Sequence, residues 1–147
     1  MRDRLYIEKK HRELYEKLDQ EEILRFTGGR RNRLEQFLFT VALGYKNECR
    51  KSLSSREGFI LLKDVPSDVR ALLSAVAIAS SDSIEVVADE DRLYTIIEEY
   101  ASGGFEILMD RLDQPLGTFE KELEKELVDL HHKLGIGNDE GQKNITY

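Results

Sequence analysis

The sequence has little of what cross-links a chain or carries it through a membrane. Its 147 residues include one cysteine, two prolines and no tryptophan. Cys49 alone cannot form an internal disulfide, which favours a reducing compartment. The longest apolar stretch, Val69–Ala79, contains Arg70 and Ser74 and is far shorter than the ~20 residues of a membrane-spanning helix. The N-terminus leads into charged residues rather than an apolar signal segment, so we expect a cytoplasmic protein.

Charge is what the sequence has in abundance. Charged residues make up 35% of the chain and hydrophobic residues 40%, which is enough for one core under a highly charged surface. The net charge of −7 is unevenly distributed. Residues 1–70 hold 16 Lys and Arg against 12 Asp and Glu, whereas residues 71–147 hold 6 against 17. This asymmetry suits a polyanion, a complementary protein or self-association, or it reflects solvated helix faces alone.

The spacing of apolar residues predicts a mainly α fold, a compact multi-helix single domain over residues 1–134. Asn32 and Ser67 are expected N-caps of two of its helices. Gly44 is expected to end one helix, and Gly103-Gly104 to interrupt another with a tight bend. The expected helices are Asp3–Leu24, Asn32–Leu43, Ser67–Ala79, Asp89–Tyr100 and Phe105–Leu112.

The conformation of two short apolar runs cannot be predicted from their sequence. Phe59–Leu62 and Ile84–Val87 each suit either a short strand or a helical turn, and as strands they would pair with each other. Tyr45–Glu57, which is polar and basic, is expected to be an ordered loop. The core-facing stripe of the helix after Ser67 is expected to contain Val69, Leu72, Leu73, Val76 and Ala77.

The C-terminal region predicts an amphipathic helix over residues 117–134 and a flexible tail over 135–147. Thr118 is its expected N-cap. The helix carries a short leucine seam that either mediates self-association, as in a homodimer, or docks onto the chain's own core. The seam consists of Leu123, Leu127, Leu130 and Leu134.

The sequence predicts no catalytic, cofactor or metal site. His131 and His132 are adjacent on a helix, so they point about 100° apart and cannot easily hold one metal ion. His11 lies among charged residues and is expected at the surface. Cys49 has two cations beside it, but no cysteine-protease pattern surrounds it. We therefore expect a protein that is not an enzyme.

The strongest physical candidate for a contact surface is a basic group around the second expected helix. Several phosphates, or an acidic protein surface, would suit these cations. The chain as a whole is acidic and has no base-reading motif, which favours a solvated or protein-binding patch over a DNA-binding one. The group consists of Arg30, Arg31, Arg33, Lys46, Arg50, Lys51 and Arg56.

Two segments, Leu38–Asn47 and Glu98–Leu108, resemble the bacterial Dnd-system-associated protein 4 family in their residues, order and separation. The resemblance implies a setting beside DNA phosphorothioation systems. In these systems sulfur replaces a non-bridging phosphate oxygen, and linked restriction components attack unmodified DNA. It carries no catalytic residues over to this chain.

Two hypotheses follow. In the first, the chain is a non-catalytic accessory protein of a phosphorothioation-linked restriction and anti-phage defence system, and it contacts other components of that system. In the second, it is a DNA-binding module that uses the basic Arg30–Arg56 region.

Overall fold

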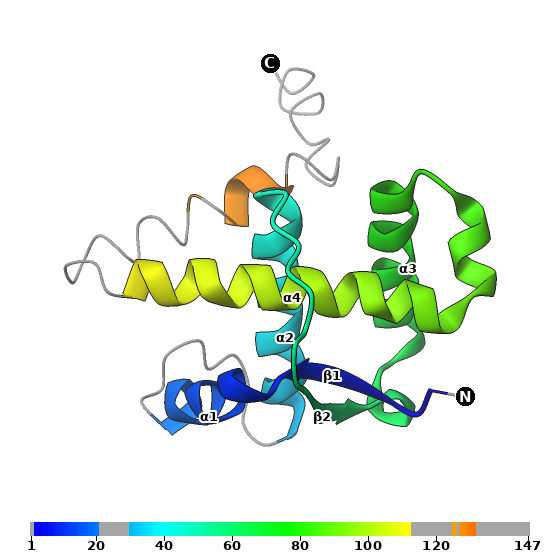
Figure 1. The fold of residues 1–147 in the computed structure, drawn as a ribbon. Coiled ribbons are helices and arrows are strands. Elements are labelled where there is room, and N and C mark those ends of the chain that lie inside the picture. Colours follow the sequence, from blue (N-terminus) through cyan, green and yellow to red (C-terminus); the bar gives the residue numbers. More distant parts are fainter. Residues whose placement is uncertain (1, 21–29, 113–124, 126, 132–147) are drawn as a thin grey trace, which may run out of the picture. The chain divides into compact units, whose positions relative to one another are not determined.

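The structure is a computed structural model that describes residues 2–20, 30–112, 125 and 127–131. The described part is mainly helical with one small sheet, which confirms the predicted fold class (Figure 1). The chain divides into two compact units, Met1–Ile107 and Leu108–Tyr147. The elements in order are β1 (Arg4–Glu8), η1 (Lys9–His11), α1 (Arg12–Gln20), α2 (Arg30–Lys46), β2 (Arg56–Leu61), η2 (Leu62–Asp64), α3 (Ser67–Ser81), η3 (Ile84–Ala88) and α4 (Glu90–Leu112), where η denotes a 3-10 helix.

The two-stranded sheet joins β1 to β2 in antiparallel register, with Leu5 opposite Ile60 and an irregularity after Leu5. The prediction that residues 59–62 pair with residues 84–87 is therefore wrong, and so is the prediction of a helix starting at Asp3. In β1, Leu5 and Ile7 are buried while the residues before and between them are partly exposed. This period of two matches a strand, and an apolar sheet partner more than 50 residues away stabilises it.

The helices α2 and α4 cross (Figure 1). Gly44 of α2 and Gly104 of α4 lie where the two backbones meet, whereas Gly103 faces Cys49 in the loop after α2. A Cβ atom on Gly44 would lie 2.0 Å from the Tyr100 carbonyl oxygen, and one on Gly104 would lie 1.7 Å from the Thr40 carbonyl oxygen. The expectations that Gly44 ends one helix and that Gly103 and Gly104 interrupt another are wrong, because both helices run straight through these positions. The glycines let the two backbones touch.

Helix α3 begins at Ser67, but Pro66 occupies the N-cap position, so the predicted cap is one residue off. Asp82 ends the helix with φ 54°, in the left-handed region. Residues Ile84–Ala88 then form η3, so the helical-turn alternative for this run is the observed one. The Ser83 side chain accepts a hydrogen bond from the Glu85 backbone N–H at 3.2 Å and begins η3.

An aromatic cluster fills the core where α1 meets α2 and α4. Tyr15 is buried between Phe59 and Phe105, with ring centroids 4.8 and 4.4 Å away. The Tyr15 hydroxyl lies 2.9 Å from the Thr40 hydroxyl. His11 is also buried and stacks on Phe105 at 4.4 Å, so its predicted place at the surface is wrong. Its sequence neighbours are charged, but η1 turns the imidazole inward.

Most of the predicted C-terminal helix over residues 117–134 lies outside the described residues. The structure describes a short helical stretch at residues 127–131, where Leu127 is exposed. Thr118, Leu123, Leu134 and the predicted tail over residues 135–147 are not described. The domain boundaries and the leucine seam therefore stay predictions.

Candidate functional site

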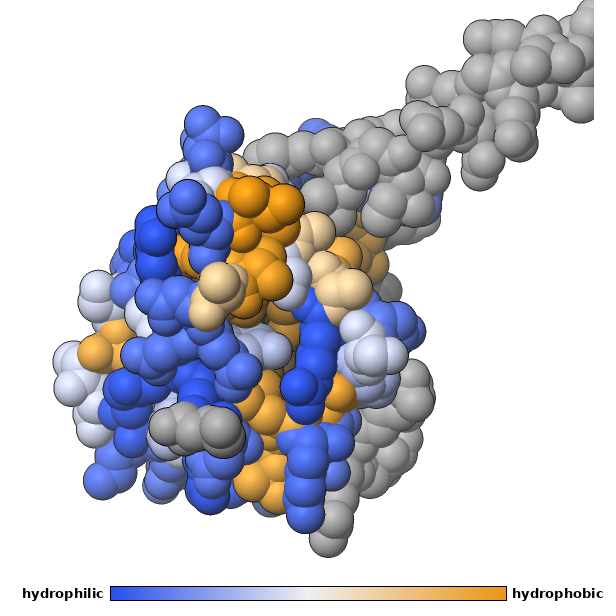
Figure 2. Space-filling view, turned by 90° about the vertical axis from the view of Figure 1, so that its right-hand side faces the viewer, coloured by the Kyte–Doolittle hydropathy of each residue, from blue (hydrophilic) through white to orange (hydrophobic). Residues whose placement is uncertain are grey.

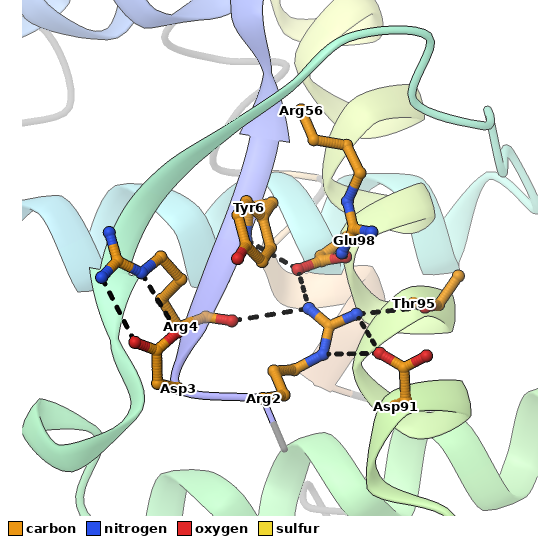
Figure 3. Close-up of polar contacts among 8 residues, drawn as sticks. All are labelled: Arg2, Asp3, Arg4, Tyr6, Arg56, Asp91, Thr95 and Glu98. Carbon is orange, nitrogen blue, oxygen red and sulfur yellow. Dashed lines mark hydrogen bonds and ion pairs between the residues drawn. The ribbon is translucent and has the colours of Figure 1, made fainter.

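A polar network gathers around Glu98, in the middle of α4 (Figure 3). Its Oε2 atom accepts hydrogen bonds from Arg2 Nη1 at 2.5 Å and from the Tyr6 backbone N–H at 2.6 Å. Arg56 Nη2 lies 3.4 Å from its Oε1 atom. The Glu98 side chain is 2% exposed and that of Arg2 3%. The network thus fastens the N-terminal strand and the start of β2 to α4.

Arg2 has further partners on α4, one helical turn or two before Glu98. It contacts the Asp91 carboxylate through Nε at 3.1 Å and Nη2 at 2.9 Å, and Nη2 also lies 3.2 Å from the Thr95 hydroxyl. The Asp91 side chain is 78% exposed, unlike Glu98. One guanidinium therefore joins a buried carboxylate to a solvated one, and the buried pair is the part whose disruption would be costly.

Burial dominates the electrostatics of this network. It raises the pKa of the Glu98 carboxyl, an effect that the Tyr6 N–H and Arg2 partly offset. Arg56 also stacks on the Tyr6 ring, with its guanidinium carbon 4.4 Å from the ring centroid. An open pocket of about 620 Å³ lies beside the network and is lined by residues of both charge signs, namely Arg2, Tyr6, Arg56, Glu90 and Asp91. The charges of its arginines are balanced by carboxylates within the chain.

A second buried carboxylate, Glu8, holds the loop between α2 and β2. It accepts hydrogen bonds from the Ser54 hydroxyl and backbone N–H, both at 2.8 Å, and from the Ser55 N–H at 3.1 Å. Burial raises the pKa of Glu8, but these three donors outweigh it and lower the pKa overall. Glu8 therefore acts as an ionised structural cap of the loop.

The predicted basic group does not form one uninterrupted patch, because several of its members have carboxylate partners on α4. Arg50 Nη2 lies 2.6 Å from Glu99, and Lys51 Nζ lies 2.7 Å from Glu106. Arg56 contacts the Glu98 network described above.

The remaining members of the basic group lie near the two ends of α2. Arg33 donates to the Phe59 carbonyl oxygen at 3.2 Å and stacks on the Phe59 ring at 4.7 Å. Lys46 is the last residue of α2. Arg30 and Arg31 begin α2, and their side chains are outside the described set.

An exposed apolar surface lies on the side of the molecule formed by α3 and η3. Ile84 is 76% exposed, Val87 48% and Leu72 44%. Figure 2 faces this side and shows hydrophobic side chains at the surface among hydrophilic ones. Leu72 was expected in the core stripe of α3, which is wrong, whereas Leu73, Val76 and Ala77 are buried as expected. Apolar periodicity alone does not reveal which side of an alanine-rich helix is covered.

Within the described ranges, no group of three or more His, Cys, Asp or Glu side chains is placed to hold a metal ion. No helix among the described residues has the length and apolar content that crossing a membrane requires. Cys49 is a free thiol that is partly exposed. Its carbonyl oxygen would lie 2.2 Å from a Cβ atom on Gly103, so its backbone packs into the helix crossing.

A comparison with protein families places the chain. The model of the family described as DNA sulphur modification system-associated protein 4 matches residues 4–138. The chain belongs to this family. Comparisons with curated proteins and with solved structures gave no match.

The family match confirms the resemblance drawn from residues 38–47 and 98–108. In this member of the DNA sulphur modification system-associated protein 4 family, residues 38–46 of the first segment lie in α2 and the whole second segment lies in α4. The two segments contain the glycines at which these helices cross. The residues that suggested the family therefore build the helix crossing, which explains why the segments resemble no catalytic motif.

Proposed function

We propose that this chain is a non-catalytic accessory protein of a DNA sulphur modification system. In this proposal it works in the cytoplasm, in the restriction and defence setting of DNA phosphorothioation, by binding another protein component of the system. The observation that carries the proposal is the exposure of large apolar side chains on α3 and η3, with Ile84 at 76%. Exposed apolar side chains that gather on one side of a protein are typical of a protein-binding surface.

The charges of α4 support a protein partner over DNA. Glu98, Glu99 and Glu106 pair with Arg56, Arg50 and Lys51, which are three members of the basic group. A DNA phosphate would have to compete with these carboxylates for each of the three cations. DNA binding gains its free energy when protein cations neutralise phosphates and release the counterions condensed on the DNA. A cation already paired with a carboxylate does this only by giving up that pair, so these pairings weaken the DNA alternative.

The roles of the buried ionisable groups support a non-catalytic protein. Glu98 holds β1 and β2 against α4, and Glu8 holds the loop after α2. His11 is stacked in the core against Phe105. Each of these groups has a structural task that accounts for its burial.

The test has a protein arm and a DNA arm. The tagged full-length chain is purified from cells that express all genes of the modification system, and bound components are identified by mass spectrometry. An equally acidic tagged protein serves as the control. We expect one component of the system to co-purify with the chain and not with the control protein.

In the DNA arm, the purified chain is mixed with phosphorothioated and unmodified duplexes in a mobility-shift assay at increasing salt. We expect no shift at physiological ionic strength. A shift that weakens with salt and is lost in an Arg50→Gln/Lys51→Gln variant that stays folded would replace the proposal with the DNA-binding alternative.

A further inference from the structure

The short helix η3 presents two apolar side chains as a pair. A 3-10 helix has three residues per turn, so side chains at i and i+3 lie above one another. Ile84 and Val87 have this spacing and are both exposed, while Val86 between them is fully buried. The helix is therefore anchored by one residue and turns the other two outward.

The backbone that carries the pair is hydrogen-bonded at both ends. The Ser83 side chain accepts from the Glu85 N–H at the start of η3, and the Asp89 N–H donates to the Val86 carbonyl oxygen at 3.1 Å at its end. The Leu93 N–H in turn donates to the Asp89 carbonyl oxygen at 2.9 Å, which links η3 to α4. A backbone held in this way needs little further ordering when a partner binds.

The charge around the pair is strongly negative. Residues 82–92 contain five acidic residues and one basic residue, Arg92. Asp82, Glu85 and Asp89 are exposed beside the apolar pair. The only basic residue of α3, Arg70, donates to the backbone carbonyl oxygens of Val65 and Leu62. We call the exposed residues Asp82, Ile84, Glu85, Val87 and Asp89 the η3 face.

We infer that the η3 face binds a cationic amphipathic helix of another protein in the same system. The apolar side of that helix covers Ile84 and Val87, and its Lys or Arg residues meet Glu85 and Asp89. DNA and anionic membranes carry the same sign of charge as this face and are repelled by it. The inference rests on the proposed function and specifies the surface and the partner chemistry for it.

The decisive variant is Ile84→Ser/Val87→Ser, because both side chains point outward and their loss leaves the core intact. The component that co-purifies with the wild-type chain is purified and titrated against both proteins. We expect the double variant to weaken binding at least about tenfold, as removal of central interface residues does. Leu61→Ser, at a 36% exposed apolar residue of β2, is the matched control and should leave the affinity unchanged.

Charge is tested separately with Glu85→Lys against Glu13→Lys, an exposed acid on α1. Glu85→Lys should weaken binding and reduce its dependence on salt, whereas Glu13→Lys should do neither. Circular dichroism melting of every variant confirms that it is folded. If a component binds and the η3-face variants retain wild-type affinity, the inference is overturned while the proposed function stands.

A model helix of Lys and Leu, compared with a Lys and Ser peptide of equal charge, tests the face when no component co-purifies. Preferential binding of the Lys and Leu helix that is lost in Ile84→Ser/Val87→Ser supports the partner chemistry inferred for the η3 face, while the absence of a co-purifying component counts against the proposed function. Equal binding of both peptides, or of neither, overturns it. A wild-type dimer in light scattering that the double variant abolishes would assign the face to a second copy and also overturn the inference.

Discussion

Gly104 of α4 lies against the backbone of Thr40 in α2, so closely that a Cβ atom on Gly104 would be 1.7 Å from the Thr40 carbonyl oxygen. The neighbouring atoms are also backbone, with the Gly44 nitrogen 2.7 Å from the same position. Backbone atoms of two packed helices cannot move aside as a flexible side chain can. This contact therefore determines how near the two helices lie at their crossing.

We predict that Gly104→Ala destabilises the fold although alanine is the better helix former. The intrinsic preference for alanine is worth about 1 kcal/mol, but separating the two backbones should cost more, for a net loss of about 3 kcal/mol. Urea unfolding measures the difference. Gly58→Ala is the control, because its Cβ atom would meet only the flexible side chain of Arg4. Equal stability of the Gly104 variant and the wild type would show that the helices do not cross at this residue.

Removal of the Glu98 carboxylate should destabilise the protein far more than removal of the Asp91 carboxylate, although both contact Arg2. Glu98→Ala leaves a buried guanidinium without its main partner and should cost about 3 kcal/mol. Asp91→Asn removes a solvated ion pair and should cost less than about 1 kcal/mol. The free energies of unfolding in urea give the comparison. Similar losses for the two variants would contradict the burial of the Arg2–Glu98 pair.

His11 should make the protein less stable in mild acid. Burial lowers its pKa below 6.5, with Lys10 acting in the same direction and Glu106 and Glu8 opposing. As the pH falls, the imidazole therefore binds a proton in the unfolded chain at a higher pH than in the folded chain. The free energy of unfolding should decrease as the pH drops from 6.5 to the folded-state pKa. Unfolding midpoints measured across this interval should fall in the wild type and less steeply in His11→Phe. Parallel pH profiles would show that His11 is solvated.

Glu8 should contribute stability in a lower pH range. Its folded-state pKa is lowered from 4.5, so its contribution is complete above that pH and is lost as the pH falls through the folded-state value. Glu8→Gln should cost about 1 kcal/mol at neutral pH, because hydrogen bonds from Ser54 and Ser55 weaken. The difference from the wild type should shrink in acid. Glu13→Gln, at an exposed position on α1, should show neither effect.

Local pattern was enough to predict the helices that carry a clear apolar stripe. The second and third expected helices, Asn32–Leu43 and Ser67–Ala79, were observed as α2 and α3 with small differences at their ends. The pattern failed at Leu5, Tyr6 and Ile7, where a strand depends on a partner far along the chain. A few apolar residues at mixed spacing fit both the helical and the strand periodicity, and only the pairing with β2 selects the strand.

Single glycines and single charged residues also differ in what the sequence predicts and what only the tertiary structure decides. A solvent-exposed glycine tends to end a helix, whereas a glycine packed against another backbone allows two helices to lie close together. Gly44 is packed in this way. The basic residues were recognisable in the sequence, but their carboxylate partners on α4 were not, since Arg50 and Glu99 are 49 positions apart. The carboxylate partner of each cation could therefore be identified only from the structure.

The sequence by itself determined the helical character of the protein, its uneven charge and the segments that mark its family. Tertiary structure alone decided that Arg2 and Glu98, 96 positions apart, form a buried pair, and that Ile84 and Val87 are left uncovered on η3. Helical periodicity arises from neighbours within one turn of the chain, which the sequence contains directly. Burial depends on which distant segments meet, and that is settled only when the whole chain packs together.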